Sequence, residues 1–285
     1  MQRSNLAPVV LQLKALGIDN VLRFDYLSAP PSELMIKALE LLYSLGALDD
    51  SAQLTKPLGT SMAELSLDPM MAKALLSAPS FGCLNEMLTI AAMASLGGNV
   101  WFHHEGERKK MESARARFAA DEGDHLTLLN AYQAFVTAGK QSPKFCHDNH
   151  LNYKSMARAV AVRAQLKRAL QQLDLRADDV APGGRDPVRA GEQIRRCLAT
   201  GFFAHAAKMR ADGTFVSVNG EVVMHAHPSS VMFTRTAEWV VFHEVLETSK
   251  KIFIRDVTKV ERGWLVEYGG GYYEVTEGKG RGGQG

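Results

Sequence analysis

Cysteine is scarce in this chain of 285 residues, which contains only Cys83, Cys146 and Cys197. Their odd number and wide spacing exclude a disulfide framework and indicate a reducing compartment. Long apolar runs are also missing: none approaches the roughly 18 residues of a membrane-spanning helix, and the N-terminus has no signal-peptide core. We therefore expect no membrane association. The net charge of +2 is too small to indicate nucleic-acid binding by itself, so any such contact must come from local patches.

Motifs of ATP hydrolysis are absent as well. No G-x-x-x-x-G-K-[ST] loop occurs, because Gly139-Lys140 and Gly278-Lys279 lack both the preceding glycine and the following serine or threonine. The acidic run from Asp121 to Asp124 resembles a magnesium-binding motif, but it follows a helical segment rather than an apolar strand. We interpret Asp124 as the N-cap of the next helix. We predict no catalytic residue and no cofactor in this chain.

Two clusters contain residue types that bind zinc. They are His103-His104-Glu105 and the run from Cys146 to His150. Neither has a paired C-x-x-C or a helical H-x-x-x-H spacing, which structural zinc sites normally use. We predict no metal site.

The segment from Phe24 to Gly59 has the pattern of a winged helix. Pro30-Pro31 end the preceding segment, Ser32 is a suitable N-cap, and Gly46 suits the left-handed end of the helix. The expected apolar face consists of Leu34, Ala38, Leu41, Leu42 and Leu45. A short wing should follow, with strands at Leu48 and at Leu54-Thr55 joined by a turn at 49–51.

Helical patterns continue to about Leu173. Asp68-Pro69 is an N-cap followed by proline at the first helical position. The run 81–96 is apolar on almost every side and predicts a buried central helix. The segment 151–173 predicts the longest helix of this part. Together these patterns favour a bundle of about six or seven helices.

The pattern changes to strands after a break at 178–185 and a helix through 201–209. Thr214–Val218 and Glu221–His225 flank Asn219-Gly220, which is a strong hairpin signal. Further strands are expected at 239–246, 251–257 and 264–268. Five short strands suit a small closed barrel such as an OB-fold.

The expected architecture is therefore α+β and multidomain. We predict a winged-helix domain over 1–62, a helical bundle over 63–177, a linker over 178–189, a five-stranded barrel with its leading helix over 190–275, and a flexible glycine-rich tail over 276–285.

Several blocks of sequence, in the same order, resemble the region that follows the motor domains of DEAH-box RNA helicases of splicing and related RNA processing. They are QRSNLAPVVLQLKALGID, the winged segment, LDPMMAKALL with GCLNEMLTIAAM, RFAADEGDHLTLLNAY, HLNYKSMARAVAVRAQL, GFFAHAAK, HPSSV and EWVVFHEVLETSKKIFIRDVT. The family places a winged helix, a ratchet-like helical bundle and an OB-fold after two RecA-like domains. The sequence YGGGYY departs from the usual proline-containing end of that barrel.

The resemblance implies an accessory region without its own ATPase motor, inactive as an enzyme alone. The complete enzyme would use ATP and magnesium, bound by the RecA-like domains, to move along single-stranded RNA in the nucleus; otherwise a cytoplasmic location is expected. A stand-alone adaptor that binds RNA or protein is the alternative. If a motor docks here, an exposed apolar surface that includes Leu6, Val9, Val10 and Leu13 is expected.

Two groups of residues are candidates for RNA contact. On the helix 151–173, Lys154, Arg158 and Arg168 lie on one side, where they suit a phosphate backbone or simply a solvated face. In the barrel, the resemblance favours polar loop positions beside the RNA channel. These are His227, Ser229, Ser230, Ser249, Lys250 and Lys251.

The winged helix is a candidate for partner binding. Its helix has Lys37 as its only basic residue, which argues against readout of DNA. In several members of the resembled family this module receives an activator protein with a glycine-rich patch. Leu34, Met35, Leu41 and Leu42 could form that groove or serve as core.

Overall fold

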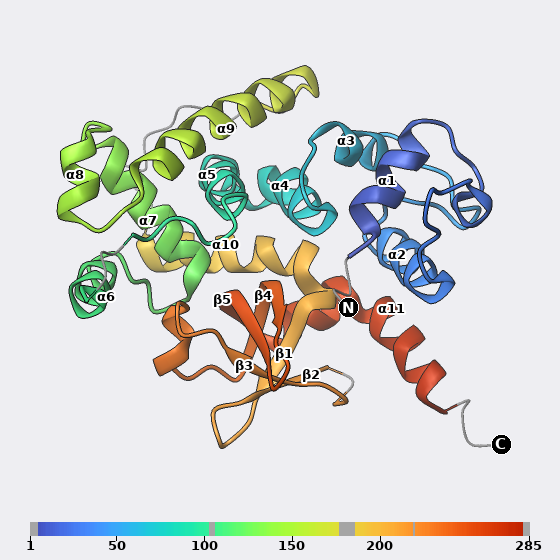
Figure 1. The fold of residues 1–285 in the computed structure, drawn as a ribbon. Helices are drawn as coiled ribbons and strands as arrows, with labels where there is room; N and C mark the ends of the chain where they lie inside the picture. The colour runs from blue at the N-terminus through green and yellow to red at the C-terminus, as the bar shows by residue number, and fades with distance from the viewer. Residues whose placement is uncertain (1–4, 103–105, 177–185, 219, 282–285) are drawn as a thin grey trace.

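The computed structural model describes the chain except for residues 1–4, 103–105, 177–185, 219 and 282–285. Figure 1 shows a winged helix at one end, a helical domain beside it, and a closed barrel packed below the helices. The predicted fold class is confirmed. Within the described ranges, no helix is long and apolar enough to cross a membrane.

The winged helix consists of α1 (Ala7–Ala15), α2 (Ser32–Ser44), α3 (Leu58–Glu64) and a short wing. Leu48 and Leu54 pair as an antiparallel bridge. The Asp49 side chain accepts hydrogen bonds from the backbone of Ser51 and Gln53, both at 2.9 Å, and so closes the predicted turn. Ser32 is the first residue of α2 rather than its cap, because Pro31 occupies the N-cap position.

The helical domain contains α4 (Pro69–Phe81), α5 (Leu84–Ala94), α6 (Arg108–Ala116), α7 (Asp124–Val136), α8 (Pro143–Asp148) and α9 (Tyr153–Gln172). The predicted cap at Asp68 is confirmed, since its carboxylate accepts from the Met70 backbone at 2.9 Å. The single helix predicted over 81–96 is wrong at its start. Phe81 ends α4, and Gly82 at φ +64° turns the chain before α5 begins. Only glycine adopts such a φ without strain.

A long helix, α10 (Pro187–Phe202), joins the helical domain to the barrel and packs closely on α4. A Cβ on Gly201 would lie 2.0 Å from the Met70 carbonyl oxygen, so that only glycine permits this approach. Most of the predicted linker, 178–189, lies outside the described residues. Its last part is helical, because α10 begins at Pro187.

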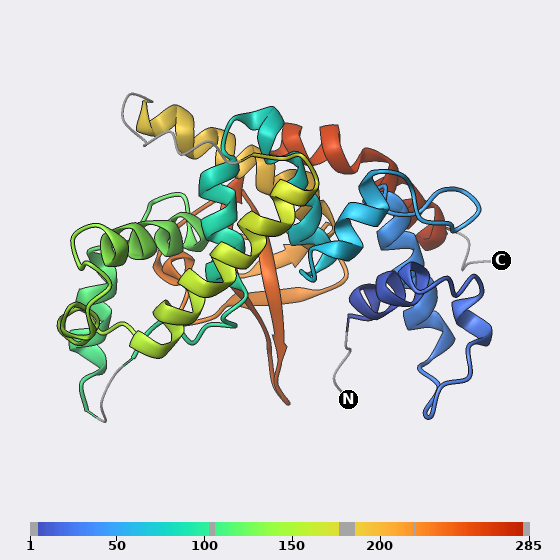
Figure 2. The same ribbon diagram turned by 90° about the horizontal axis from the view of Figure 1, so that it is seen from above.

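The barrel consists of β1 (Ala206–Met209), β2 (Phe215–Ser217), β3 (Val223–Ala226), β4 (Trp239–Glu247) and β5 (Ile252–Val260), in the closed order β1-β2-β3-β5-β4. The hairpin predicted around Gly220 is confirmed by the antiparallel pairing of β2 with β3, although Asn219 lies outside the described residues. The β4–β5 hairpin extends away from the body of the molecule (Figure 2).

Three expectations about the last third are wrong. The helix predicted over 201–209 ends at Phe202, and β1 follows it. The strand predicted over 264–268 is the start of α11 (Arg262–Arg281), which also replaces the predicted tail over 276–281. Packing explains the helix despite its glycines. Trp264 and Leu265 are buried, and a Cβ on Gly269 would lie only 2.8 Å from Phe203.

Candidate nucleic-acid interface

A buried carboxylate, Asp124, joins the helical domain to the barrel. It lies in the first turn of α7, only 7% exposed, and accepts hydrogen bonds from Ser230 Oγ at 2.5 Å and from the backbone of Val231 and Val257, both at 2.8 Å. The predicted role of Asp124 as a helix cap is therefore wrong. Gly123 occupies the N-cap position, and the Asp124 side chain reaches the barrel instead of its own helix.

The hydrogen bond to Asp124 holds the Ser230 side chain inside the junction between α7 and the barrel. This side chain is only 2% exposed, donates to Asp124, and accepts from the Met232 backbone at 3.1 Å. The expectation that Ser230 contacts RNA is a misassignment, because the hydroxyl is occupied and buried. Its role is to hold the loop after β3 against α7.

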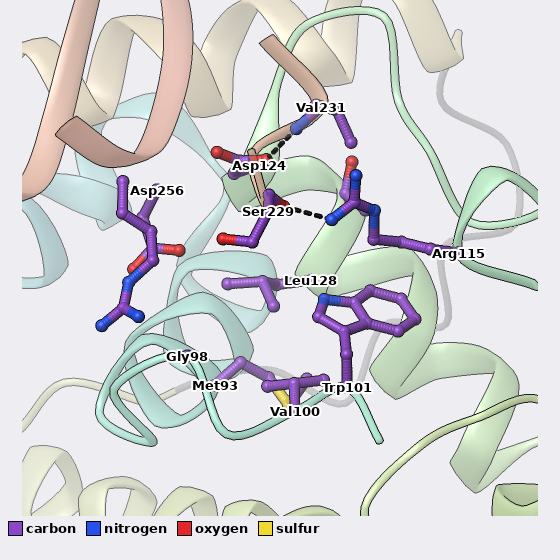
Figure 3. A pocket seen from close by; sticks show the side chains of 12 residues that line it. Met93, Gly98, Val100, Trp101, Arg115, Asp124, Leu128, Ser229, Val231 and Asp256 are labelled. Carbon is purple, nitrogen blue, oxygen red and sulfur yellow. Dashed lines mark hydrogen bonds between the residues drawn. The ribbon is translucent and has the colours of Figure 1, made fainter. Parts of the chain in front are cut away.

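Ser229 and His227 lie nearer the surface. The Ser229 hydroxyl is 2.7 Å from His227 Nδ1, and the Ser229 carbonyl accepts from the Arg115 guanidinium (Figure 3). Burial, followed by the charges of Arg255 and Arg115, lowers the pKa of His227. At neutral pH this imidazole is uncharged, so it offers a ring for stacking rather than a positive charge.

The rings of His225, His227 and Phe253 form an aromatic platform on the barrel. His225 of β3 pairs in parallel register with Phe253 of β5, and their ring centroids are 6.0 Å apart. The His227 ring lies edge-on to Phe253 at 5.8 Å. All three side chains are partly exposed. Such partly exposed rings can stack on unpaired bases.

Beyond the platform, an exposed turn joins the end of β4 to the start of β5 and contains Ser249, Lys250 and Lys251. The Thr248 hydroxyl closes the turn by donating to the Lys251 carbonyl at 2.8 Å. Both lysines are exposed, and they lie at the end of the strand pair that also carries Phe253. The structure thus places two predicted cations on the hairpin that contributes Phe253 to the aromatic platform.

The cations predicted on α9 lie elsewhere. Lys154, Arg158 and Arg168 are exposed, but α9 and the barrel lie on opposite sides of α5 and α10 (Figure 1). Arg163 points inward, where its guanidinium donates to Thr89 at 2.8 Å and to Asn85 at 3.2 Å. The α9 cations and the hairpin therefore do not form one continuous patch.

A cavity of about 30 Å³ lies where the loop after α5 meets α7 and the barrel. Trp101, Arg115, Ser229, Arg255 and Asp256 are among the residues that line it (Figure 3). The Arg255 guanidinium lies against Gly98, donates to the Gly97 carbonyl at 2.9 Å and pairs with Glu244. Sequence reasoning missed both Arg255 and Asp256, since they lie inside a strand with no motif of their own.

The predicted partner-binding residues of α2 lie mostly in the core. Met35 is 2% exposed and Leu42 is fully buried, while Leu34 and Leu41 are half-buried. The outward side of α2 instead presents Ile36, at 43% exposure. Burial of this kind leaves Met35 and Leu42 unavailable to a partner.

Exposed apolar residues do occur near the N-terminus, but they differ from the expected set. Val10 is fully buried, which removes it from the predicted docking surface, and Val9 is 49% exposed. Leu6 and Leu13 pack partly against the core. The most exposed apolar residues nearby are Leu16 and Leu27.

Cysteine and histidine form no metal site in the part of the chain that the structure describes, where no group of three or more possible ligands converges. Burial raises the pKa of the Cys146 thiol to about 11, so that it remains protonated. His103, His104 and Glu105 lie outside the described residues.

Comparison with known proteins gives a family match for each of the three regions of the chain. Family models match the helicase-associated (HA2) winged-helix domain over 38–67, the ratchet-like helicase-associated (HA2) domain over 68–128, and the oligonucleotide/oligosaccharide-binding fold over 194–272. The chain is 45% identical over 275 residues to a probable ATP-dependent RNA helicase DHX35 from Pongo abelii, covering 96% of this chain and 37% of that protein.

Two further relatives agree. The probable ATP-dependent RNA helicase DHX35 from Homo sapiens is 44% identical over 275 residues, which is 96% of this chain and 38% of the relative. The DHX35 homolog from Caenorhabditis elegans is 44% identical over 282 residues, or 98% of this chain and 37% of the relative. The chain thus spans less than two-fifths of the length of these relatives.

Proposed function

Because this chain belongs to the helicase-associated C-terminal region of the DEAH-box RNA helicases, we propose that it lines the path of single-stranded RNA and docks the ATP-hydrolysing motor. ATP and magnesium bind in the RecA-like domains of that motor, and regulators dock on this region. Nuclear RNA processing, including splicing, is the proposed setting. The aromatic platform with its neighbouring lysines carries the proposal.

The chemistry of the β4–β5 hairpin suits an unpaired strand. Stacking on Phe253 needs no particular base, and Lys250 and Lys251 are free to meet phosphates because both are exposed. An RNA duplex offers no unstacked bases to such a platform. The hairpin therefore favours single-stranded RNA over duplex.

Binding of a fluorescent single-stranded RNA to the 285-residue chain tests this part of the proposal. Phe253→Leu should weaken binding by about 1–3 kcal/mol, the value of one stacked base. The double substitution Lys250→Glu and Lys251→Glu should weaken binding further and reduce the dependence of binding on salt concentration. Tyr43→Leu is the control, since Tyr43 is an exposed aromatic residue of α2, 52% exposed, in the winged helix. Equal losses in all variants, or none, would refute the assignment of the hairpin.

The exposed apolar residues near the N-terminus support docking of a motor. Leu16 is 77% exposed and Leu27 is completely exposed, so both side chains are available to a docked motor. A stand-alone adaptor should instead be monodisperse without a partner. Light scattering distinguishes the two: the chain should self-associate, and Leu16→Gln with Leu27→Gln should reduce this. A monodisperse wild-type chain would favour the adaptor.

A further inference from the structure

Asp256 is a buried carboxylate that no other described residue satisfies. The residue is only 7% exposed, yet no hydrogen bond to its side chain is seen within the described ranges. It lines the cavity at the junction, and Figure 3 shows Asp256 and Ser229 both directed toward this space. The carboxylate oxygens of Asp256 stay accessible at the cavity, so they are open to a hydrogen-bond donor that enters from outside the chain.

The backbone of β5 is shaped to aim this side chain. Asp256 has φ +55°, a left-handed conformation that costs energy for a non-glycine residue. Ile254 and Val257 both point into the barrel core although they are three residues apart, so the alternation of the strand shifts by one residue between them. Two adjacent side chains, Arg255 and Asp256, consequently line the same cavity.

The charges around the cavity explain what Asp256 can accept. Two guanidinium groups, from Arg115 of α6 and Arg255 of β5, balance the carboxylates of Asp124 on α7 and Glu244 on β4. An ionised Asp256 adds one negative charge. Burial, then Asp124 and Glu244, raise its pKa to about 7, against the opposing effect of Arg255. A neutral hydrogen-bond donor suits this site better than an anion does.

The size of the cavity limits the ligand further. At about 30 Å³ it holds one or two groups of the size of water and excludes a nucleobase. A hydroxyl group is the right size. The cavity also lies close to the platform, since the three steps along β5 from Phe253 to Asp256 span about 10 Å. A chain stacked on Phe253 would carry a neighbouring ribose past the cavity.

We infer that Asp256 accepts a hydrogen bond from a ribose 2′-hydroxyl of the bound strand and thereby distinguishes RNA from DNA. This inference rests on the proposed function, because it requires a strand on the platform. The 2′-hydroxyl is the group by which proteins tell the two nucleic acids apart. Ser229, facing the same space, positions the hydroxyl from the other side.

The test compares binding of oligouridine and oligodeoxyuridine of equal length to the 285-residue chain. Wild type should prefer RNA by about 10- to 100-fold, the range for one hydrogen bond to a charged acceptor. Asp256→Asn should lose most of that preference while its binding of oligodeoxyuridine stays unchanged. Asp148→Asn, the same change on the exposed surface of α8, should keep it. The preference should also be larger above pH 7 than below, because the ionised carboxylate is the stronger acceptor.

The outcomes separate the two proposals. If wild type binds both oligonucleotides equally well, the cavity holds water only, and the inference about Asp256 is overturned while the proposed function stands. If wild type binds neither, the proposed function fails and this inference with it. Single 2′-deoxy substitutions along the RNA provide a second measurement that needs no variant. One position should account for most of the loss, and an even spread over all positions would count against a single hydroxyl site.

Discussion

The junction between the helical domain and the barrel should depend on Asp124 more than on any surface charge near it. Asp124→Asn keeps the shape of the side chain but leaves one oxygen to accept from Ser230, Val231 and Val257. At least one buried backbone N–H then loses its acceptor and faces an amide N–H₂. The unpaired N–H destabilises the folded state, and the remaining hydrogen bonds are weaker because their acceptor is no longer charged. Together these effects should lower the free energy of unfolding by about 3 kcal/mol.

Hydrogen exchange followed by mass spectrometry gives a local measurement of this effect. A loss of about 3 kcal/mol corresponds to roughly 100-fold faster exchange of the Val231 and Val257 amides wherever their exchange requires opening of the junction. Asp121→Asn is the matched control. Its carboxylate is 91% exposed and pairs with Arg235 at 2.9 Å, so its loss should cost less than about 1 kcal/mol. Equal exchange in the two variants would refute the reasoning.

Two further changes test the packing and the buried charge. Because the pKa of Asp256 is raised to about 7 from 3.8, the folded state binds a proton that the unfolded state releases; its stability should fall as the pH rises from about 4 to about 7 and then level off. The decline should amount to on the order of 4 kcal/mol, and Asp256→Asn should lack it. Urea unfolding at several pH values measures this, and parallel plots of stability against pH for the two proteins would disprove the raised pKa of Asp256. Gly201→Ala should prevent close packing of α10 on α4 and lower the melting temperature strongly, because its Cβ would meet the Met70 carbonyl at 2.0 Å. Gly263→Ala, with no atom within 4 Å of the added Cβ, should have no such effect, and similar melting temperatures for the two glycine variants would contradict the close approach.

Local signals predicted much of the fold. The cap at Asp68, the wing after α2 and the hairpin at Gly220 depend on a few neighbouring residues, and each was found. Errors arose where distant packing decided the structure. YGGGYY has poor helix propensity, yet α11 forms because Trp264 and Leu265 bury against the rest of the molecule. The residues of β1 continue a helical pattern and become a strand only through pairing with β2 and β4.

The candidate site was only partly predictable for the same reason. Lys250 and Lys251 were indicated by the family resemblance, which favours polar positions in the loop between two predicted strands of the barrel. Sequence reasoning misassigned Asp124 and Ser230, since an acid before a helix is normally a cap and the contact between these two spans 106 positions. Asp256 carried no signal at all. Its significance comes from a left-handed backbone conformation at this position of β5 and from a cavity that exists only in the assembled barrel.

Photo-crosslinking of 4-thiouridine RNA to the 285-residue chain, with the attachment sites mapped by mass spectrometry, tests the central claim most directly. The account predicts crosslinks on the β4–β5 hairpin, centred on Phe253 and reduced by Phe253→Leu. Crosslinks confined to α9, around Lys154 and Arg158, would contradict it, because that helix lies on the opposite side of α5 from the barrel.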